Sequence, residues 1–420
     1  MRKILGVHLL AAAGAAVLLL VLGHERVSAQ GSPTVQLPDS ATLEDYLAYA
    51  GEHSPALKAA AARWDAATRV GPQRRSLPDP TLSLSATQME RRTSLGVSQM
   101  LPFFGKRALE GEMADEEAAA AERQVEVARL TVFARVVAGY AEYAFSRQAL
   151  ANVRESLALV RQLEEVTLTR YRTGEAPYAD LVRAQVERGR LEDEVRTWED
   201  RLPAEGALLN AAIGRPADAP LPEPGALRPR PLRLDEGSLL AELRQANPEL
   251  ASIRHEVAAA RLGIDRARRA YYPDLGIGLE YMRSGEMNRS GVGAMVSVTL
   301  PVRRQRLRAG VEEAEARHEV VRALEQEAGN LLEAEARGAL FRYNDALRKG
   351  ALYQNELVPQ ARQSLVATEA AYRAGAATYQ DLIESYRTVL AFELVLARTV
   401  ADQVRHLAEL ELYVGRRLRP

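Results

Sequence analysis

Two short stretches of the chain carry the same order of tyrosine, glycine and carboxylate. Residues 171–181 read YRTGEAPYADL and residues 372–382 read YRAGAATYQDL, so Asp180 and Asp381 occupy equivalent places. Glu384 adds a carboxylate just after the second stretch. Around a common axis of several chains, copies of these carboxylates would crowd together, favour partial protonation and attract cations. The residues therefore favour a site that attracts cations; the simpler interpretation is two helix caps and a solvated glutamate.

Residue types that commonly bind metals or catalyse reactions are not spaced for those roles in this sequence. After residue 29 four histidines occur, and none lies three or four residues from another, which excludes a helical metal-binding pair. The four are His53, His255, His318 and His406. The sequence contains no cysteine, no nucleophile arrangement of serine and histidine, and no glycine-rich phosphate loop after a strand. We therefore predict no enzyme activity, no metal site and no cofactor.

Very long helical segments flank each repeated stretch. Residues 103–172 contain no proline, and at about 1.5 Å of rise per residue they predict roughly 100 Å of helix. Apolar residues three and four apart form coiled-coil seams along it. These seams contain Leu130, Phe133, Val137, Tyr140 and Ala144, then Leu150, Val153, Leu157 and Val160. Pro203 and Pro359 predict bends or breaks in two of the long helices.

Each repeated stretch is therefore predicted to be the tip of a long helical hairpin. Gly174 and Gly375 would let the chain turn with positive φ. Asp180 and Asp381 stand where the returning helix begins and needs a cap.

The whole chain is a tandem duplication. Five landmarks recur in the same order, and the offset between the copies grows from 193 residues at Ser54 and Asn247 to 201 residues at Gly214 and Gly415. Small insertions between two copies of one unit would produce this drift. We predict a first repeat over residues 30–215, a proline-rich joint over 216–235 and a second repeat over 236–420. Each repeat should open with one helix of moderate length, over about residues 41–71 and 236–270.

Two short segments of each repeat alternate apolar with small or polar residues. Residues 275–281 and 292–300 do so cleanly, and residues 82–87 and 95–98 less cleanly. A period of two predicts β-strands, and strands of about nine residues can cross a bilayer at a tilt. We expect the apolar face to meet lipid and the small polar face to line a lumen. The alternative is a hairpin that packs on a helix layer and exposes its polar face to water.

Four strands cannot close a membrane barrel. Open sheet edges are not tolerated in a bilayer, and barrels of this kind have at least about eight strands, so two or more chains would have to share one. The predicted fold class is mainly α, with duplicated long coiled-coil hairpins and four strands of a small membrane β-barrel part per protomer.

The beginning of the chain resembles an export signal. Residues 1–3 are a short basic start, residues 4–22 an apolar run, and residues 27–29 small residues before Gln30. We predict a signal peptide over residues 1–29, with a retained membrane anchor as the alternative. The absence of cysteine excludes a lipid-bearing cysteine after the signal. A net charge of -1 gives no reason to expect nucleic acid as a partner.

This order of signal, helix, β-hairpin and long coiled-coil hairpin, all duplicated, resembles the TolC family of outer-membrane efflux ducts. The segment leaving the first β-hairpin, residues 101–107 (LPFFGKR), is also similar to a signature of that family. The resemblance implies a homotrimer with a twelve-stranded barrel in the outer membrane of a Gram-negative-type bacterium and a helical tunnel in the periplasm. It also implies two partners, a periplasmic adaptor (membrane fusion) protein and an inner-membrane pump of the RND type.

The resemblance further implies a closable periplasmic entrance at the hairpin tips. Tyr372 matches a tyrosine that bonds to an aspartate at the position of Asp180, and Asp381 and Glu384 match an inward-facing acidic pair. A second link of some members uses positions that here are Ala377 and Ala179, so other contacts, such as those of Arg172 or Arg373, would have to replace it. The adaptor would dock on the tips. The residues expected there are Tyr171, Arg172, Gly174, Leu181, Arg373, Gly375 and Leu382.

The function predicted from the sequence is an exit duct of a tripartite efflux system that passively conducts metal cations or small toxic compounds. The Gly105-Lys106-Arg107 segment resembles members that serve heavy-metal exporters. Two alternatives remain open at this point: a periplasmic coiled-coil scaffold or adaptor, and a duct for secreted polypeptides.

Overall fold

A computed structural model describes residues 37–38, 41–87, 92–103, 105–227, 232, 234–284 and 289–418. The chain divides into two units, Met1–Gln36 and Leu37–Pro420, and the described residues all belong to the second. The predicted signal peptide over residues 1–29 and Phe104 lie outside the described residues.

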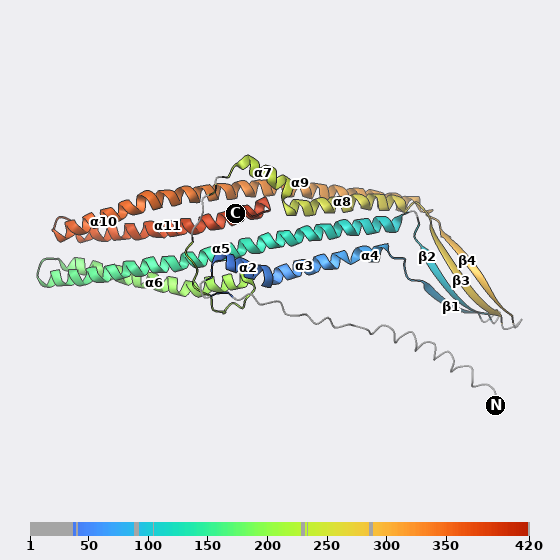
Figure 1. Ribbon diagram of the computed structural model, residues 1–420, viewed down its shortest axis with the longest axis horizontal. Helices are drawn as coiled ribbons and strands as arrows, with labels where there is room; N and C mark the ends of the chain where they lie inside the picture. The colour runs from blue at the N-terminus through green and yellow to red at the C-terminus, as the bar shows by residue number, and fades with distance from the viewer. Residues whose placement is uncertain are drawn as a thin grey trace, which may run out of the picture. The chain divides into compact units, whose positions relative to one another are not determined.

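The second unit consists of two repeats, each with short helices first, then a β-hairpin and then a long helical hairpin (Figure 1). The first repeat comprises α2 (Leu43–His53), α3 (Pro55–Thr68), α4 (Val70–Arg75), β1 (Thr81–Thr87), β2 (Arg92–Leu101), α5 (Lys106–Arg172) and α6 (Tyr178–Ile213). The second comprises α7 (Glu236–Ala246), α8 (Pro248–Arg269), β3 (Asp274–Ser284), β4 (Arg289–Thr299), α9 (Arg304–Leu352), the π-turn η1 (Tyr353–Leu357), α10 (Val358–Arg373) and α11 (Tyr379–Val414). With 67 residues, α5 is about 100 Å long, as predicted.

The first helical segment of each repeat is broken, and the prediction of one helix there was wrong. Ser54 and Asn247 have ψ of 121° and 124°, outside the helical region, and a proline follows each. The residue before a proline is pushed out of the α conformation, whereas proline itself fits the first position of a new helix. The side chain of Asn247 then caps α8 by accepting from the Glu249 and Leu250 amides.

The first and last landmarks of each repeat meet in space. Gly415 ends α11 with φ of 91°, and a Cβ there would lie 2.6 Å from Cδ of Pro248 and 2.8 Å from Cα of Asn247. Nδ2 of Asn247 also donates to the carbonyl of Tyr413 at 2.8 Å. The corresponding Gly214 has φ of 83° and lies against Pro55 in the same way. These landmarks recur because, in each repeat, the glycine that ends the last helix packs against the proline at the break in the first helical segment.

The four strands form one antiparallel sheet in the order β1-β2-β3-β4. The central pair, β2 and β3, joins the two repeats, with Val97 opposite Leu279. At the base of this pair, Nζ of Lys106 lies 2.8 Å from Oδ1 of Asp274 and donates to the Tyr272 carbonyl at 2.9 Å. Lys106 therefore ties the end of one β-hairpin to the beginning of the other.

The two faces of the sheet differ in kind. The register places the large aliphatic residues on one face, where Leu84 and Val292 are each 75% exposed and Val296 is 73% exposed. The opposite face carries glycine and serine, such as Gly96 and Ser83. No described helix packs across either face. The alternative of a β-hairpin packed on a helix layer is therefore wrong, because the aliphatic face has no cover within the described chain.

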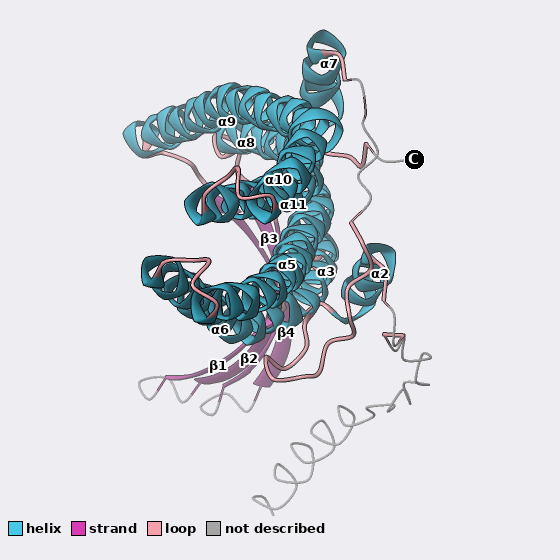
Figure 2. Ribbon diagram, turned by 90° about the vertical axis from the view of Figure 1, so that its left-hand side faces the viewer, coloured by secondary structure: helices cyan, strands magenta, loops and turns pink. Residues whose placement is uncertain are grey.

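The helices pack along α5, which contacts α3, α4, α6, α8 and α11. In Figure 2 the long helices of this unit follow a curve when viewed along their length. The largest core cluster includes Tyr46 of α2, Val136 and Tyr140 of α5, and Leu209 and Ile213 of α6. None of the described helices has an apolar window long enough to span a membrane.

The two helical prolines behave differently. The helix α6 continues through Pro203, so the break that was one of the two predicted outcomes does not occur there. Before Pro359, by contrast, α9 gives way to the π-turn, whose Tyr353 packs edge-on against Phe392 of α11 at 5.5 Å between ring centroids. A π-turn takes up the irregularity that a proline without an N–H introduces.

Candidate functional site at the hairpin tips

The tips of the two helical hairpins lie at the end of the long helices remote from the sheet (Figure 1). Gly174 and Gly375 have φ of 78° and 73°, as predicted for these turns. The backbone closes each turn in the same way, with the Glu175 amide donating to the Arg170 carbonyl at 2.7 Å and the Ala376 amide to the Ala371 carbonyl at 2.8 Å. The repeated sequence therefore builds the same turn twice.

The helix caps of the two tips differ. In the second tip, Oγ1 of Thr378 donates to Oδ2 of Asp381 at 2.7 Å, and the Asp381 amide donates back to Thr378 at 3.2 Å. The Thr378 hydroxyl and amide bonds lower the pKa of Asp381. In the first tip, Pro177 stands at the cap position and offers no hydroxyl or N–H, so Asp180 pairs instead with Arg183 at 3.0 Å. The prediction that both aspartates cap a helix holds only for Asp381, in a capping box with Thr378.

A small apolar core joins the two hairpins behind their tips. Leu163 and Ala184 of the first hairpin pack with Tyr372, Tyr379 and Leu382 of the second. Leu382 is 2% exposed and, in the first hairpin, Leu181 is 6% exposed, so both serve packing. The exposed side chains among the residues expected to dock a partner are Tyr171, Arg172 and Arg373.

Tyr372 contacts the first hairpin through its ring rather than its hydroxyl. Its Oη is buried and has no hydrogen-bond partner within the described residues, so the expected bond to Asp180 is not formed in this structure. The Arg170 guanidinium instead lies 4.9 Å from the centre of the Tyr372 ring, and its Nη1 is 3.4 Å from the Tyr372 carbonyl oxygen. Tyr379 meets the same ring edge-on at 6.1 Å.

Asp381 and Glu384 line one small hollow between α10 and α11. Its volume is about 270 Å³, and hydroxyl groups such as those of Thr368 and Ser385 complete it. Glu384 has a side chain that is 72% exposed, and its Oε2 lies 3.9 Å from Nη1 of Arg387. The structure therefore brings the two expected acids together on the second hairpin, while Asp180 stays on the first.

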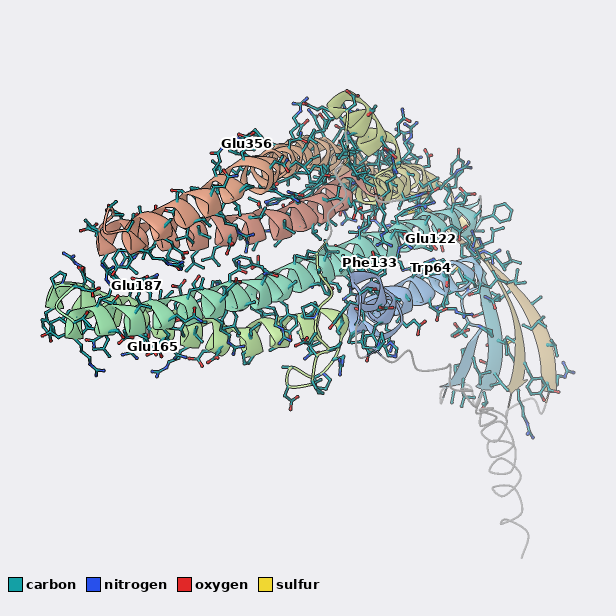
Figure 3. All side chains as sticks on the ribbon, turned by 60° about the vertical axis from the view of Figure 1, so that its left-hand side comes forward. Trp64, Glu122, Phe133, Glu165, Glu187 and Glu356 are labelled. Carbon is teal, nitrogen blue, oxygen red and sulfur yellow. The ribbon has the colours of Figure 1, made fainter. Side chains whose placement is uncertain are left out.

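A buried carboxylate, Glu187 of α6, was not identified from the sequence. It is 2% exposed, and Figure 3 labels it on the first hairpin, on the side toward the second. Its Oε2 accepts from Nη2 of Arg387 at 2.6 Å, and its Oε1 accepts from Nη2 of Arg190 at 2.7 Å. Burial alone would raise the pKa of Glu187, but the bonds to the two arginines outweigh it and lower that pKa. One sequence signal could have indicated its burial: Glu187 lies three residues after Ala184 and four before Leu191, on the same helix face, and both of these residues are buried.

A second ion-pair group joins the hairpins farther from the tips. Arg398 of α11 donates to both oxygens of Glu142 on α5, at 2.7 and 2.8 Å. Arg405 lies 3.5 Å and Arg201 3.9 Å from the same carboxylate. Burial of Glu142 opposes ionisation, but the arginines prevail and lower its pKa. The helix α11 is thus tied to the first hairpin by arginine at two levels.

Within the described residues the histidines lie apart, each beside a partner of its own. His255 lies 2.7 Å from Glu116, His406 lies 2.9 Å from Glu409, and His53 stacks on Tyr49 at 4.2 Å between ring centroids. No group of three or more potential metal-ligating residues occurs in the described part of the chain.

Comparisons with known proteins agree with this architecture. Residues 47–202 and 239–416 match the family model described as Outer membrane efflux protein. Protein CyaE of Bordetella pertussis is 28% identical over 300 residues, which cover 64% of this chain and 61% of that protein. The probable efflux pump outer membrane protein SepC of Pseudomonas putida is 28% identical over 221 residues, which cover 50% of this chain and 44% of that protein. The chain thus spans less than two thirds of the length of these two relatives.

The fold also matches a solved structure. The outer membrane protein VceC from Vibrio cholerae has a TM-score of 0.75 against this chain, with 90% of this chain and 97% of that chain covered, at 20% sequence identity. The likeness shows that the duplicated helical hairpins and the four-stranded sheet form one known architecture.

Proposed function

The chain belongs to the outer membrane efflux protein family, and we propose that three copies of it form the exit duct of a tripartite efflux system. In this proposal the duct is passive: energy is spent at the inner-membrane pump, and this chain supplies the conduit. It conducts substrates that an inner-membrane pump and a periplasmic adaptor deliver to the tips.

The exposed aliphatic face of the sheet carries this proposal. Large apolar patches on a protein surface mark contacts with other proteins or with a membrane. Here the patch covers much of one face of a sheet. Its outer strands, β1 and β4, each have a described partner on one side only. In lipid both edges need further strands. Three chains with four strands each supply twelve, enough to close a barrel.

The long helices and the tips supply the remaining parts of the duct. The curve of helices seen in Figure 2 is compatible with one segment of a tunnel wall. At its end, Asp381 and Glu384 of each protomer would approach their symmetry copies and favour cations. The exposed Tyr171, Arg172 and Arg373 at the same end suit docking of the adaptor.

Membership of this family favours a duct over the soluble scaffold that the sequence alone left open. The cargo stays a proposal: metal cations or small toxic compounds, with secreted polypeptides as the alternative. A duct contacts its cargo loosely, so we expect the pump to determine which substrates pass.

Cell fractionation tests the assembly. We expect the protein to resist salt and alkali, to require detergent for extraction, and to migrate near three times its monomer mass. A salt-soluble monomer would reject the duct. Growth of a deletion strain on graded copper, zinc, cobalt and nickel, beside dyes and antibiotics, then separates metal export from export of organic compounds.

A further inference from the structure

The ion pair between Glu187 and Arg387 lies outside the repeated tip sequence. The two oxygens of Glu187 serve different helices: Oε1 bonds to Arg190 on its own helix, and Oε2 bonds to Arg387 on the opposite hairpin at 2.6 and 3.1 Å. A carboxylate is almost never fully buried unless it is paired. Burial of Glu187 therefore requires these bases, and Arg387 is the one of the two that lies on the second hairpin.

This ion pair has no counterpart in the duplication. An offset of 201 residues places Val186 at the position equivalent to Arg387, and Thr388 at the position equivalent to Glu187. Val186 is 64% exposed. The duplication therefore does not account for the pair, which forms once per protomer and in one direction, from the acid of the first hairpin to the base of the second.

The pair is also the direct polar tie between α6 and α11 in this region. The backbone of α11 runs closer to α5 than to α6, so the long Arg387 side chain has to reach across to Glu187. Closer to the turn, Ala179 and Ala377 have no side-chain donor or acceptor, and the Tyr372 hydroxyl is buried without a partner among the described residues. Within the described residues, the bonds of Arg387 to Glu187 are thus the main directional polar contact between these two helices here.

We propose that the Glu187–Arg387 pair is a latch that holds the second hairpin of each protomer against the first and keeps the entrance closed. The proposal rests on the duct function proposed above. Opening the entrance by moving the second hairpin outward from the first requires this bond to break. A partner that docks on the tips can favour the open state only if its binding offsets the loss of the Glu187–Arg387 bond.

The arrangement also makes the latch testable without loss of folding. Removing one partner of a buried pair is severe when it leaves an unpaired charge. In an Arg387→Ala variant, Glu187 keeps its bond to Arg190, so the buried charge stays paired. Arg190→Ala is the matched control: it removes a guanidinium from the same carboxylate but leaves the two hairpins joined.

The experiment records single-channel currents of the full-length purified protein in planar bilayers. For Arg387→Ala we expect the ratio of open to closed time to rise about tenfold or more, and for Arg190→Ala to stay within about twofold of the wild type. Adding Glu187→Gln to Arg387→Ala should cause little further change, because both substitutions break the same bond.

Two other results would overturn the latch in distinguishable ways. If the wild type conducts and Arg387→Ala opens no more than Arg190→Ala, the duct stands and the latch is rejected. If the wild type and all three variants fail to conduct, the duct function itself fails, and the latch fails with it.

Discussion

The guanidinium of Arg170, at the end of α5, lies 4.9 Å from the centre of the Tyr372 ring at the end of α10. An arginine over an aromatic face contributes about 0.5–1 kcal/mol when exposed and about 2 kcal/mol when desolvated. The Tyr372 side chain is buried, whereas its hydroxyl has no partner within the described residues. The contact between the tips therefore uses the ring of Tyr372, not its hydroxyl oxygen.

The first prediction separates ring from hydroxyl. Tyr372→Phe should leave the open fraction of the channel within about twofold of wild type, because the hydroxyl that it removes makes no hydrogen bond to the described residues. Arg170→Ala should raise the open fraction several-fold, by about 1 kcal/mol of lost contact. Single-channel recording measures both. A large effect of Tyr372→Phe, matched by Asp180→Ala, would instead favour the direct Tyr372–Asp180 bond.

The second prediction concerns the acids at the second tip. Asp381→Ala and Glu384→Ala should each reduce the preference for cations over anions, since each removes one negative charge per protomer from the entrance. Thr378→Ala is the control, because it removes the capping partner of Asp381 and keeps the charge. Reversal potentials in a salt gradient report the preference. Unchanged potentials in both acid variants would remove these residues from the conduction path.

The third prediction concerns the contact of Lys106 with Asp274 and the Tyr272 carbonyl, at the base of the β2–β3 pair. Lys106→Met should destabilise the assembled protein by about 1.5–3 kcal/mol, the usual range for a hydrogen bond to a charged group. The neighbouring Arg107→Ala removes a bond to the Arg75 carbonyl, at 3.2 Å. It should lower the free energy of unfolding by less than Lys106→Met does. Thermal unfolding in detergent compares them. Equal unfolding midpoints for the two variants would argue against a stabilising role of the Lys106–Asp274 contact.

The fourth prediction concerns the closure of the repeats. Gly415→Ala should destabilise by at least about 1–2 kcal/mol, because alanine disfavours a positive φ and its Cβ would meet Pro248 at 2.6 Å. Gly329→Ala in α9 is the control: nothing lies near its added Cβ, and alanine favours helix over glycine by about 1 kcal/mol. Similar loss of stability in both variants would contradict the close approach.

The fifth prediction is a pH dependence set by Glu142. The pKa of Glu142 is lowered below the ordinary 4.5 in the folded chain. Its ionised carboxylate therefore contributes fully to the free energy of unfolding above pH 4.5, and this contribution is lost as the pH falls through the lowered pKa. The difference in unfolding midpoint between wild type and Glu142→Gln should be constant from about pH 7 to 5 and shrink below about 4.5. A difference that grows on acidification would contradict the pairing of Glu142 with Arg398.

Sequence periodicity predicted the duplicated plan because the determinants are local. A proline-free apolar seam specifies α5, alternation specifies β3 and β4, and Gly174 and Gly375 specify the turns. The broken first helices were also within reach, since Pro55 and Pro248 stand at the break. Pro203 shows the opposite case, in which packing maintains a helix that local propensity alone would interrupt.

The polar ties between the hairpins could not be predicted in the same way. Glu187 and Arg387 are two among many glutamates and arginines on helix surfaces, and their pairing depends on how α6 and α11 approach. Lys106 likewise reaches Asp274 across more than 160 residues of sequence. Such contacts follow from tertiary geometry, whereas the spacing of Glu187 within a buried seam is the one local hint.

The most direct measurement for the central claim is the current through planar bilayers containing the purified, detergent-extracted protein. We predict discrete, cation-preferring conductance steps from particles that contain three chains. Chains that remain monomeric and produce no steps, in the wild type and in the Arg387→Ala variant alike, would contradict the duct.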